Sequence, residues 1–344
     1  MSGAVEVFLD ETPGETRGAI MRDGRYTHLL IHREDDAAQT RLGARSVGRV
    51  IEVNPGLRGA FVDIAAPTAA FLPFPRSDRI TQGQRLEVVV TAEPHAGKGA
   101  VVRRQGPGEG APRLIQPAPS IAEQLRDLAP GEESVTGIAA IDAGVEAAED
   151  ALAQSIVFAS HGIDLAIERT RALVAVDIDF ASTPGRDPKQ ARAAANREGL
   201  KQAARLISLR NWGGLVVIDM VGDGQDAEAQ SKVVRAAFSQ EPQAVFGSIS
   251  RFGLLQMSLP WRRTPIEETL FDDGGRPSVQ TRAISVVRAL RRQLLADTLS
   301  PRIMAHCAPE EALIAQPLAA RLGPRAVIQA DAAIPPGRVR IEEG

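Results

Sequence analysis

The chain has 344 residues, 44% hydrophobic and 24% charged, which is typical of a globular protein with two or three domains. The single cysteine, Cys307, excludes an internal disulfide and any zinc site with two or more thiolates from one chain. A net charge of −3 argues against a protein that simply coats nucleic acid. No apolar run approaches the roughly 18 residues of a membrane span and no signal peptide is visible, so we expect a cytoplasmic protein.

The charge is unevenly distributed along the chain. Residues 41–104 hold ten Lys/Arg against five Asp/Glu, whereas residues 120–170 hold two against ten. Such asymmetry fits a polyanion-binding face within a near-neutral protein. Ordinary surface patchiness explains it equally well, so charge alone leaves both interpretations open.

The first third of the chain is rich in strand signals. Residues 1–38 predict three strands, with Asp23-Gly24 as a hairpin turn between the last two. Five more segments, separated by Gly and Pro, predict a small barrel of the OB type: 46–54, 59–64, 69–73, 85–92 and 99–104. The Gly- and Pro-rich stretch 105–119 predicts a loop or linker. Helices are expected at 121–128 and 145–154.

The character of the sequence changes after residue 163. Strands are expected at 171–178, 215–220 and 243–249, and helices from Asp187-Pro188 to about 211 and over 227–239. This β-α-β-α-β order predicts an α/β layer. A linker at 262–278 then leads to a small terminal β-α-β module, made of an Arg-rich amphipathic helix at 279–299, a strand at 302–307, a helix at 309–322 and a strand at 325–330.

Three carboxylates lie in strands of the predicted α/β layer. Asp177 and Asp179 belong to VAVDIDF, and Asp219 belongs to VVIDM. Alternation along a strand puts Asp177 and Asp179 on one side, and neighbouring strands would bring Asp219 to the same sheet edge. Mg²⁺ binds one or two carboxylates together with waters and a substrate phosphate, and can activate water. Structural caps or ion pairs would account for the same residues, so the pattern alone leaves this open.

Other candidates lie outside these strands. Arg251, in SISRFGLLQMS (248–258), is placed either to bind phosphate or to brace a turn. Phe61 and Phe71 lie on neighbouring barrel strands, where they would either stack on bases or fill the core. Lys98 lies on the Gly-flanked loop HAGKGA. We expect Cys307 to be a core residue, and the sequence contains no P-loop, nucleophile elbow or dinucleotide-binding glycine motif.

Four blocks of sequence resemble the catalytic half of the ribonuclease E/G family in a shortened form. Two are similar to its S1 domain: GRVIEVNPGLRGAFVDIAAPTAAFLPF (48–74) and GKGAVV (97–102). The others are similar to its DNase I-like catalytic core: ALVAVDIDFAS (172–182) with NREGLKQAARLISLRNWGGLVVIDM (196–220), and SISRFGLLQMS (248–258). A weaker resemblance extends through 1–38 and 280–344.

The resemblance implies a mixed α+β multidomain fold with six parts. They are N-terminal strands of a reduced RNase H-like part (1–38), an S1-type OB barrel that binds RNA (39–105), a linker with a shortened RNase H-like and 5′-sensor region (106–162), a DNase I-like α/β catalytic domain (163–264), a linker in place of the zinc-link (265–278) and a small C-terminal domain (279–344).

It also implies an Mg²⁺-dependent endoribonuclease, with Mn²⁺ as an alternative ion, that cuts single-stranded RNA and leaves 5′-phosphate and 3′-hydroxyl ends in RNA processing or decay. The family match makes Asp177 and Asp219 the metal ligands and places Asp179 at a catalytic position that is usually Asn. Arg251, Phe61, Phe71 and Lys98 match RNA-contacting positions. Asn196 and Glu198 match a helix face near the active site.

Three departures from the family pattern limit these expectations. The stretch 265–278 holds no cysteine, so no zinc is expected and family-type oligomers cannot form through a zinc-link. Residues 133–144 show no counterpart of the 5′-monophosphate sensor, and we expect no degradosome-type docking tail. These losses, together with Asp179, keep open an RNA-binding protein with weak or no nuclease activity. A DNA nuclease or DNA-binding module is a third interpretation, which the S1 resemblance disfavours.

Overall fold

The computed structural model describes residues 4–75, 78–153, 155–158, 162–180, 187–222 and 227–344. The chain forms two compact units: residues 1–149 with 265–344 make the first, and residues 150–264 make the second. Each unit has its own sheets and is described by itself. Across the described residues, none of the helices combines the length and apolar character needed to span a membrane.

The first unit begins with a four-stranded sheet. Its strands, in chain order, are β1 (Val5–Thr12), β2 (Glu15–Arg22), β3 (Arg25–Arg33) and the short β10 (Ser134–Val135), which runs parallel to β1. The three strands predicted for the N-terminal segment are confirmed. So is the turn, because Asp23 and Gly24 both have positive φ (51° and 71°), as a two-residue type I′ hairpin requires.

Helix α1 (Ile121–Leu128) packs on this sheet, where the sequence predicted a helix. Ser120 begins it with a capping box: its hydroxyl accepts from the Glu123 backbone N–H at 3.2 Å, and the Glu123 carboxylate accepts from the Ser120 N–H at 2.7 Å. The next helix, α2 (Ile138–Leu152), begins well before the helix predicted at 145–154, and residue 154 lies outside the described residues.

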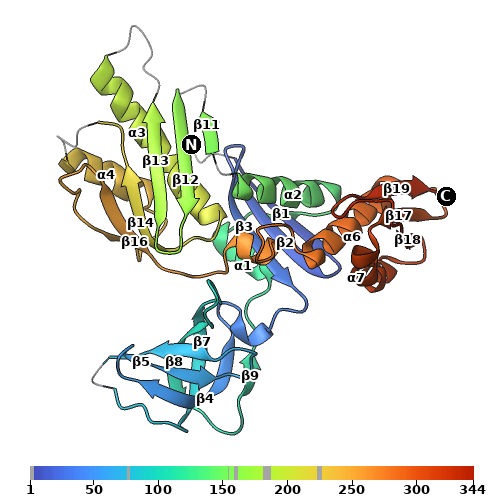
Figure 1. Ribbon diagram of the computed structural model, residues 1–344, viewed down its shortest axis with the longest axis horizontal. Helices are drawn as coiled ribbons and strands as arrows, with labels where there is room; N and C mark the ends of the chain where they lie inside the picture. The colour runs from blue at the N-terminus through green and yellow to red at the C-terminus, as the bar shows by residue number, and fades with distance from the viewer. Residues whose placement is uncertain (1–3, 76–77, 154, 159–161, 181–186, 223–226) are drawn as a thin grey trace. The chain divides into compact units, whose positions relative to one another are not determined.

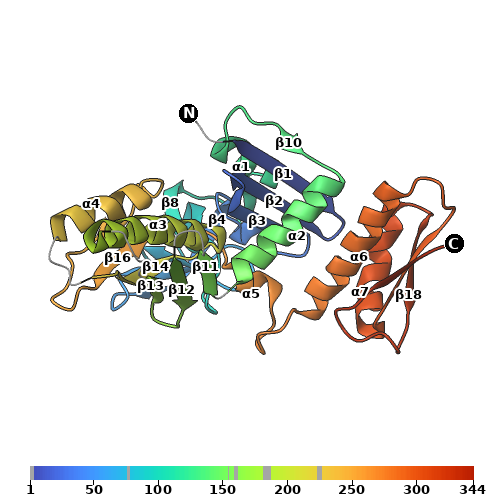
Figure 2. The ribbon, with the colours of Figure 1, turned by 90° about the horizontal axis from the view of Figure 1, so that it is seen from above.

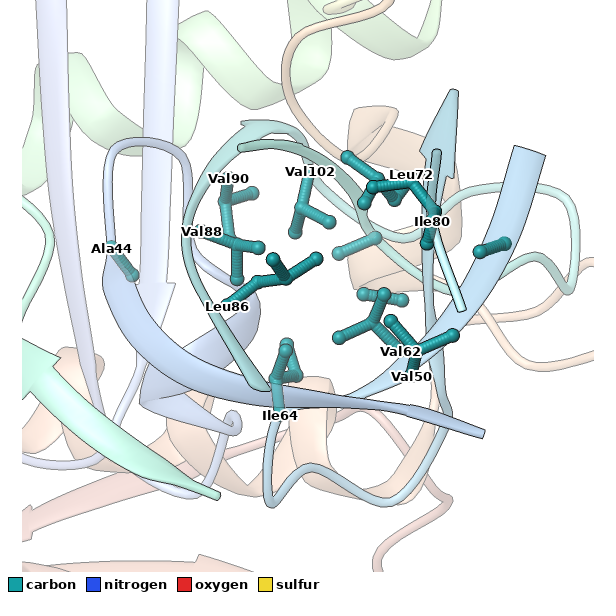
Figure 3. Packing of buried hydrophobic residues seen from close by; sticks show 13 residues of the cluster. Ala44, Val50, Val62, Ile64, Leu72, Ile80, Leu86, Val88, Val90 and Val102 are labelled. Atoms are coloured by element: carbon teal, nitrogen blue, oxygen red, sulfur yellow. The ribbon is translucent and has the colours of Figure 1, made fainter. Parts of the chain in front are cut away.

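Five strands of the first unit close into a barrel, confirming the five predicted strands. They are β4 (Arg45–Asn54), β5 (Gly59–Asp63), β6 (Ala70–Pro73), β7 (Arg85–Ala92) and β8 (Val101–Pro107), drawn in blue to cyan in Figure 1. The ladder runs β5-β6-β8-β7-β4, and pairing of β4 with β5 closes the ring. Inward-facing side chains, including Val62, Leu72, Leu86 and Val102, fill its apolar core (Figure 3).

The stretch 105–119 was predicted as a loop, and this is wrong for part of it. β8 continues to Pro107, and β9 (Arg113–Gln116) pairs antiparallel with the start of β4. The prolines do not prevent this, because Pro112 and Pro117 flank β9 and leave the four residues between them with free backbone N–H groups.

The second unit is a six-stranded mixed sheet. Its strands, in spatial order, are β11 (Ser155–Phe158), β12 (Ile163–Arg169), β13 (Val174–Phe180), β14 (Gly214–Asp219), β16 (Leu255–Leu259) and β15 (Val245–Phe246). Neighbouring β13 and β14 are parallel, and the other neighbouring pairs are antiparallel. A parallel pair needs a crossover, which α3 (Pro188–Leu209) provides.

The predicted β-α-β-α-β order is right for the first two strands and wrong for the third. Instead of one strand at 243–249, the chain forms the two-residue β15, turns, and returns as β16 against β14. Strands β11 and β12 were not predicted, and β13 begins at Val174 rather than 171. The alternation of Ile163, Leu165 and Ile167, all buried, was the missed signal for β12.

Helices α3 and α4 (Ala227–Ala237) lie on the same side of this sheet (Figure 2). Asp187 caps α3 by accepting from the Lys189 backbone N–H at 3.0 Å, as predicted. Beneath the helices, the buried side chains of β13 and β14 include Val176, Ile178 and Ile218. The alternate residues of the same strands therefore point to the opposite, open face.

A three-stranded module completes the first unit. It consists of α6 (Val279–Ala296), β17 (Ile303–Cys307), α7 (Pro309–Ala319), β18 (Ala326–Ala330) and β19 (Arg340–Glu343). Parallel β17 and β18 confirm the predicted β-α-β, and β19 is an additional antiparallel strand. Cys307 is buried as predicted, and burial raises the pKa of its thiol to about 11, as for an unreactive core cysteine.

The predicted linker 262–278 contains a helical turn, α5 (Ile266–Leu270), which corrects that prediction. Ile266 and Leu270 are four residues apart, so one turn places both on the same side, and both are buried.

A buried charge cluster fastens α6 to the N-terminal sheet. Glu15, on β2, accepts from Arg17 Nε (2.6 Å), Arg33 Nε (2.8 Å) and Arg288 Nη2 (3.0 Å). Arg288, on α6, also donates to Asp10 at 2.7 Å. Burial opposes ionisation of Glu15, but the three guanidinium groups prevail and hold its pKa well below its usual range.

Candidate active site

Two carboxylates stand opposite each other at the centre of the second unit's sheet. In the parallel β13–β14 ladder, Asp177 and Asp219 are direct register partners. Both are exposed, on the face opposite α3 and α4, and Asp219 is the last residue of its strand. The predicted convergence of these two residues at neighbouring strands is therefore confirmed.

Two more carboxylates share this face. Asp179 lies two residues after Asp177 and is the register partner of Asp164 on antiparallel β12. Partial burial is the main cause that raises the pKa of Asp177, and repulsion from the carboxylates of Asp179, Asp219 and Asp164 raises it further. The face therefore concentrates negative charge. At Asp177 and Asp219, no cationic side chain among the described residues neutralises it.

These residues fit a hard divalent cation. No Arg or Lys forms a described ion pair with Asp177 or Asp219, so their charge is available to a bound ion. Within the described residues, no three His, Cys, Asp or Glu side chains converge into a protein-built metal cage. Mg²⁺ does not need one, because it keeps several waters and uses one or two carboxylates together with substrate phosphates.

Substituting Asp177 with Asn should stabilise the fold at neutral pH. Because the pKa of Asp177 is raised, its ionised carboxylate destabilises the folded state. This destabilisation is relieved as the pH falls through the raised pKa and the carboxylate is protonated. Screening limits the gain to roughly 1 kcal/mol or less, or about 1–3 °C in Tm. Thermal unfolding between pH 3 and 8 in EDTA should show a gain that vanishes at the acid end.

Added Mg²⁺ should then raise the Tm of the wild type more than that of Asp177→Asn, at constant ionic strength held with KCl. A Tm for the variant below that of the wild type at pH 7 would contradict the like-charge account.

A buried asparagine fixes the segment that follows Asp219. Asn196, on α3, donates through Nδ2 to the Val221 carbonyl and accepts through Oδ1 from the Val221 N–H, both at 2.9 Å. It thus holds both backbone groups of a residue two positions beyond Asp219. The sequence placed Asn196 near the site without a role, and the structure makes it a positioning residue.

A glycine sets the spacing of α3 above β13. A Cβ at Gly199 would lie 2.6 Å from Cγ2 of Ile178, closer than real side chains approach. Ile178 is the residue between Asp177 and Asp179, so this close approach fixes the strand that carries both carboxylates. We infer that only glycine fits here without moving the helix or the strand.

Glu198 does not reach the carboxylate face through any described contact. It accepts from Gln202 Nε2 at 2.8 Å, and Gln202 accepts from Arg205, which pairs with Asp150 at 2.5 Å. This chain of contacts ties α3 to the segment before β11 and is structural.

Arg251 lies on a turn between β15 and β16. The antiparallel register pairs Ile218 with Leu255, so this turn leads into β16 beside the end of β14, where Asp219 lies. The Arg251 side chain is exposed, and its guanidinium carbon is 4.7 Å from the centroid of the Phe252 ring. Within the described residues it makes no ion pair, which favours the phosphate-binding interpretation over bracing of the turn.

The barrel carries its two candidate phenylalanines on the outside. Phe61 and Phe71 are register partners on β5 and β6, half-buried, with ring centroids 5.6 Å apart and planes at 60°. Their neighbours along the strands, not these rings, fill the core, so the core interpretation is wrong. A Cβ at Gly59 would lie 2.2 Å from Cζ of Phe71, so this glycine makes room for the ring.

Lys98 ends a tight hairpin beside β6. Its backbone N–H donates to the His95 carbonyl at 2.9 Å, and its side chain is exposed. The following residues lie against β6: a Cβ at Gly99 would be 2.1 Å from the Ala69 carbonyl oxygen, and Phe71 N–H donates to the Ala100 carbonyl at 2.8 Å. The hairpin and the Phe71 strand therefore belong to one side of the barrel.

The predicted residues thus form two groups. Asp177, Asp179 and Asp219 share one sheet face of the second unit, with Arg251 on a turn at its edge. The phenylalanines and Lys98 belong to the barrel of the first unit.

The described residues thus present an open sheet face with carboxylates on neighbouring strands, and a barrel that carries two half-buried phenylalanines and an exposed lysine on its outside. Residues 122–261 match the model of the Ribonuclease E/G family. The resemblance that the sequence blocks predicted is therefore confirmed over this part of the chain.

Individual relatives show the same similarity. A protein named putative ribonuclease E from Buchnera aphidicola is 32% identical over 130 residues, which is 36% of this chain and 31% of that protein. Ribonuclease E of Escherichia coli is 36% identical over 115 residues, 32% of this chain and 11% of that enzyme. Ribonuclease G of Haemophilus influenzae is 33% identical over 118 residues, 28% of this chain and 24% of that enzyme. The matched regions thus span less than a third of each relative.

Proposed function

We propose that the protein is a divalent-metal-dependent endoribonuclease that cuts single-stranded RNA. The observation that carries this proposal is the register pairing of Asp177 with Asp219 on an open sheet face, within the region similar to ribonucleases E and G. Water would add to a backbone phosphorus, and the 3′-oxygen would leave, giving 5′-phosphate and 3′-hydroxyl ends.

Each residue of the site has a role in this proposal. Asp177 and Asp219 would hold Mg²⁺ or Mn²⁺, which supplies Lewis-acid stabilisation of the phosphoryl charge and lowers the pKa of a water. Arg251 would bind a phosphate oxygen, and Asp179 would accept a hydrogen bond from the attacking water, at the position where the family usually has Asn. Asn196 keeps the segment after Asp219 in place.

The barrel would provide the grip on the strand. Stacking of bases on exposed aromatic rings is tolerant of sequence, and basic side chains bind the backbone between them. Phe61 and Phe71 offer two adjoining, half-buried rings, and Lys98 offers a cation on the same side of the barrel. We interpret this barrel as the S1-type domain and the second unit as the DNase I-like layer. A cytoplasmic site of action and a role in RNA processing or decay complete the proposal.

The proposal is tested with the wild-type protein and a 5′-labelled single-stranded RNA. We expect cleavage in Mg²⁺, none in EDTA, products with 5′-phosphate and 3′-hydroxyl ends, and little competition from single-stranded DNA. Cleavage that persists in EDTA would contradict it, and so would 2′,3′-cyclic phosphate ends.

One observation supports a second candidate, an RNA-binding protein with weak or no nuclease activity. Asp179 faces Asp164 across the β12–β13 ladder, so the face carries charge that repels a substrate phosphate. Binding of RNA without cleavage in the same assay would favour this candidate, and Asp179→Asn would then be the first variant to restore cleavage.

Removing the aromatic faces of the barrel should weaken RNA binding. Phe61→Leu and Phe71→Leu retain an apolar side chain but lose the ring, and each should reduce affinity about fivefold to a hundredfold. Fluorescence anisotropy with a labelled single strand measures the effect. Ile115→Ala, on exposed β9 of the same barrel, is the matched control and should bind normally. Unchanged affinity in both Leu variants would contradict the proposed grip.

A further inference from the structure

Phe252 is unusually exposed for an aromatic side chain. Its side chain is 72% exposed, and it is the one aromatic among the exposed large hydrophobic residues that the structure describes. Aromatic residues make up only 4% of the chain, so the protein places a scarce residue type where it buries little. Packing of the fold does not account for this position.

The backbone turn that presents Phe252 is well defined. The Ser250 hydroxyl accepts from the N–H groups of Phe252 (3.3 Å) and Leu254 (3.2 Å). Ser250 N–H donates to the Leu254 carbonyl at 2.8 Å, and Gly253, with φ of +82°, donates to the Ser250 carbonyl at 3.0 Å. Gly253 supplies the left-handed conformation that this turn needs. The ring is therefore held outward by a hydrogen-bonded turn.

The ring also has a cation beside it. The Arg251 guanidinium lies over the Phe252 ring at 4.7 Å from the centroid. An aromatic ring and a guanidinium side by side match the two parts of a nucleotide, because the ring stacks on a base and the guanidinium binds a phosphate.

The turn lies at the end of the sheet that carries the acidic pair. β16 begins at Leu255, the register partner of Ile218, and Asp219 follows Ile218. Phe252 is three residues before Leu255, so it belongs to the same sheet edge as Asp219. A ligand phosphate held by the carboxylates would have its neighbouring base within reach of this edge.

We propose that Phe252 is a stacking platform for one base of single-stranded RNA, next to the phosphate that is cut. The base lies on the ring face opposite Arg251. This inference rests on the proposed function and adds a nucleobase subsite to it.

The test measures binding in an Asp219→Asn background, which retains RNA uncut. Phe252→Ala, Phe252→Leu and Phe252→Trp are compared by anisotropy with a labelled single-stranded oligoribonucleotide. A set of oligonucleotides with one abasic nucleotide at each position in turn locates the stacked base. Leu313→Ala, at an apolar residue 76% exposed on α7, is the matched control. Thermal unfolding checks that Tm is unchanged.

We expect Ala and Leu to weaken binding about fivefold to a hundredfold and Trp to preserve it. In the Asp219→Asn parent, one abasic position should weaken binding as much as Phe252→Ala does with the intact oligonucleotide. In the Phe252→Ala variant, the same abasic position should cause no further loss of affinity. Affinities of Ala and Leu within twofold of the parent would overturn the platform. The platform would also be overturned if an abasic nucleotide reduced affinity equally at every position, and equally in the parent and in the Phe252→Ala variant.

Wild-type cleavage, measured in parallel, separates this inference from the proposed function. If the wild type cuts RNA but Phe252→Ala binds normally, the platform fails and the nuclease stands. If Phe252→Ala loses affinity but the wild type does not cut, the subsite stands as part of an RNA-binding protein and the nuclease fails.

Discussion

Asp177→Asn is expected to lower the rate of RNA cleavage about 10²- to 10⁴-fold while leaving RNA affinity nearly unchanged. A carboxylate that holds a catalytic metal contributes several kcal/mol of transition-state stabilisation, and each 1.4 kcal/mol is a factor of ten in rate. Asp219→Asn should behave alike, because the two residues are register partners on one face. Single-turnover cleavage gives the rate, and anisotropy gives the affinity.

Glu168→Gln is the matched control for this variant. Glu168 is an exposed acidic residue on the same face of neighbouring β12, opposite Ala175 rather than the acidic pair. It should cut RNA at nearly the wild-type rate. Equal loss of binding and cleavage in Asp177→Asn would contradict a metal-ligand role, and so would a Glu168→Gln variant that is equally inactive.

Glu15→Gln should destabilise the first unit by about 3–5 kcal/mol. The Glu15 side chain is 0% exposed and compensates the charges of Arg17, Arg33 and Arg288. Neutralising it leaves buried guanidinium groups without their shared partner, which is far costlier than losing a surface ion pair. Urea-induced unfolding measures the change in free energy.

Glu34→Gln serves as the comparison, because Glu34 pairs with Arg321 where both side chains are about half exposed. It should cost less than about 1 kcal/mol. The lowered pKa of Glu15 adds a pH signature: its contribution to stability is fully present above the ordinary pKa of a glutamate, declines progressively below it, and is gone only below the lowered pKa. A Glu15→Gln variant as stable as Glu34→Gln would contradict the account of the cluster.

Local sequence patterns predicted the elements that carry the site. Asp177 and Asp219 follow β-branched runs, and the crossover helix between them begins at an Asp-Pro cap, so parallel neighbouring strands were a sound expectation. The five barrel strands were readable because glycine and proline separate them. The sequence could not decide whether Phe61 and Phe71 face inward, because the register of β5 and β6 decides it.

What the sequence did not predict depends on contacts between distant segments. The short strands β16 and β19 each pair with a strand that already has a neighbour on its other side: β16 pairs with β14, and β19 pairs with β17. The residue pattern within a short segment does not show such a pairing. Arg288 belongs to an Arg-rich helix, yet it is buried by partners more than 270 positions earlier, Asp10 and Glu15. Asn196 likewise gained its role only when α3 met the end of β14.

The most direct test of the central claim replaces one oxygen of the cut phosphate with sulfur. An RNA with a single phosphorothioate at the mapped cleavage site is compared with unmodified RNA in Mg²⁺ and in Mn²⁺. Mg²⁺ prefers oxygen strongly, whereas Mn²⁺ accepts sulfur more readily. The account predicts slower cleavage of the modified RNA in Mg²⁺, by about tenfold or more, with the rate restored in Mn²⁺ for one stereoisomer. Equal cleavage of both RNAs in Mg²⁺, or cleavage that needs no divalent ion, would contradict it.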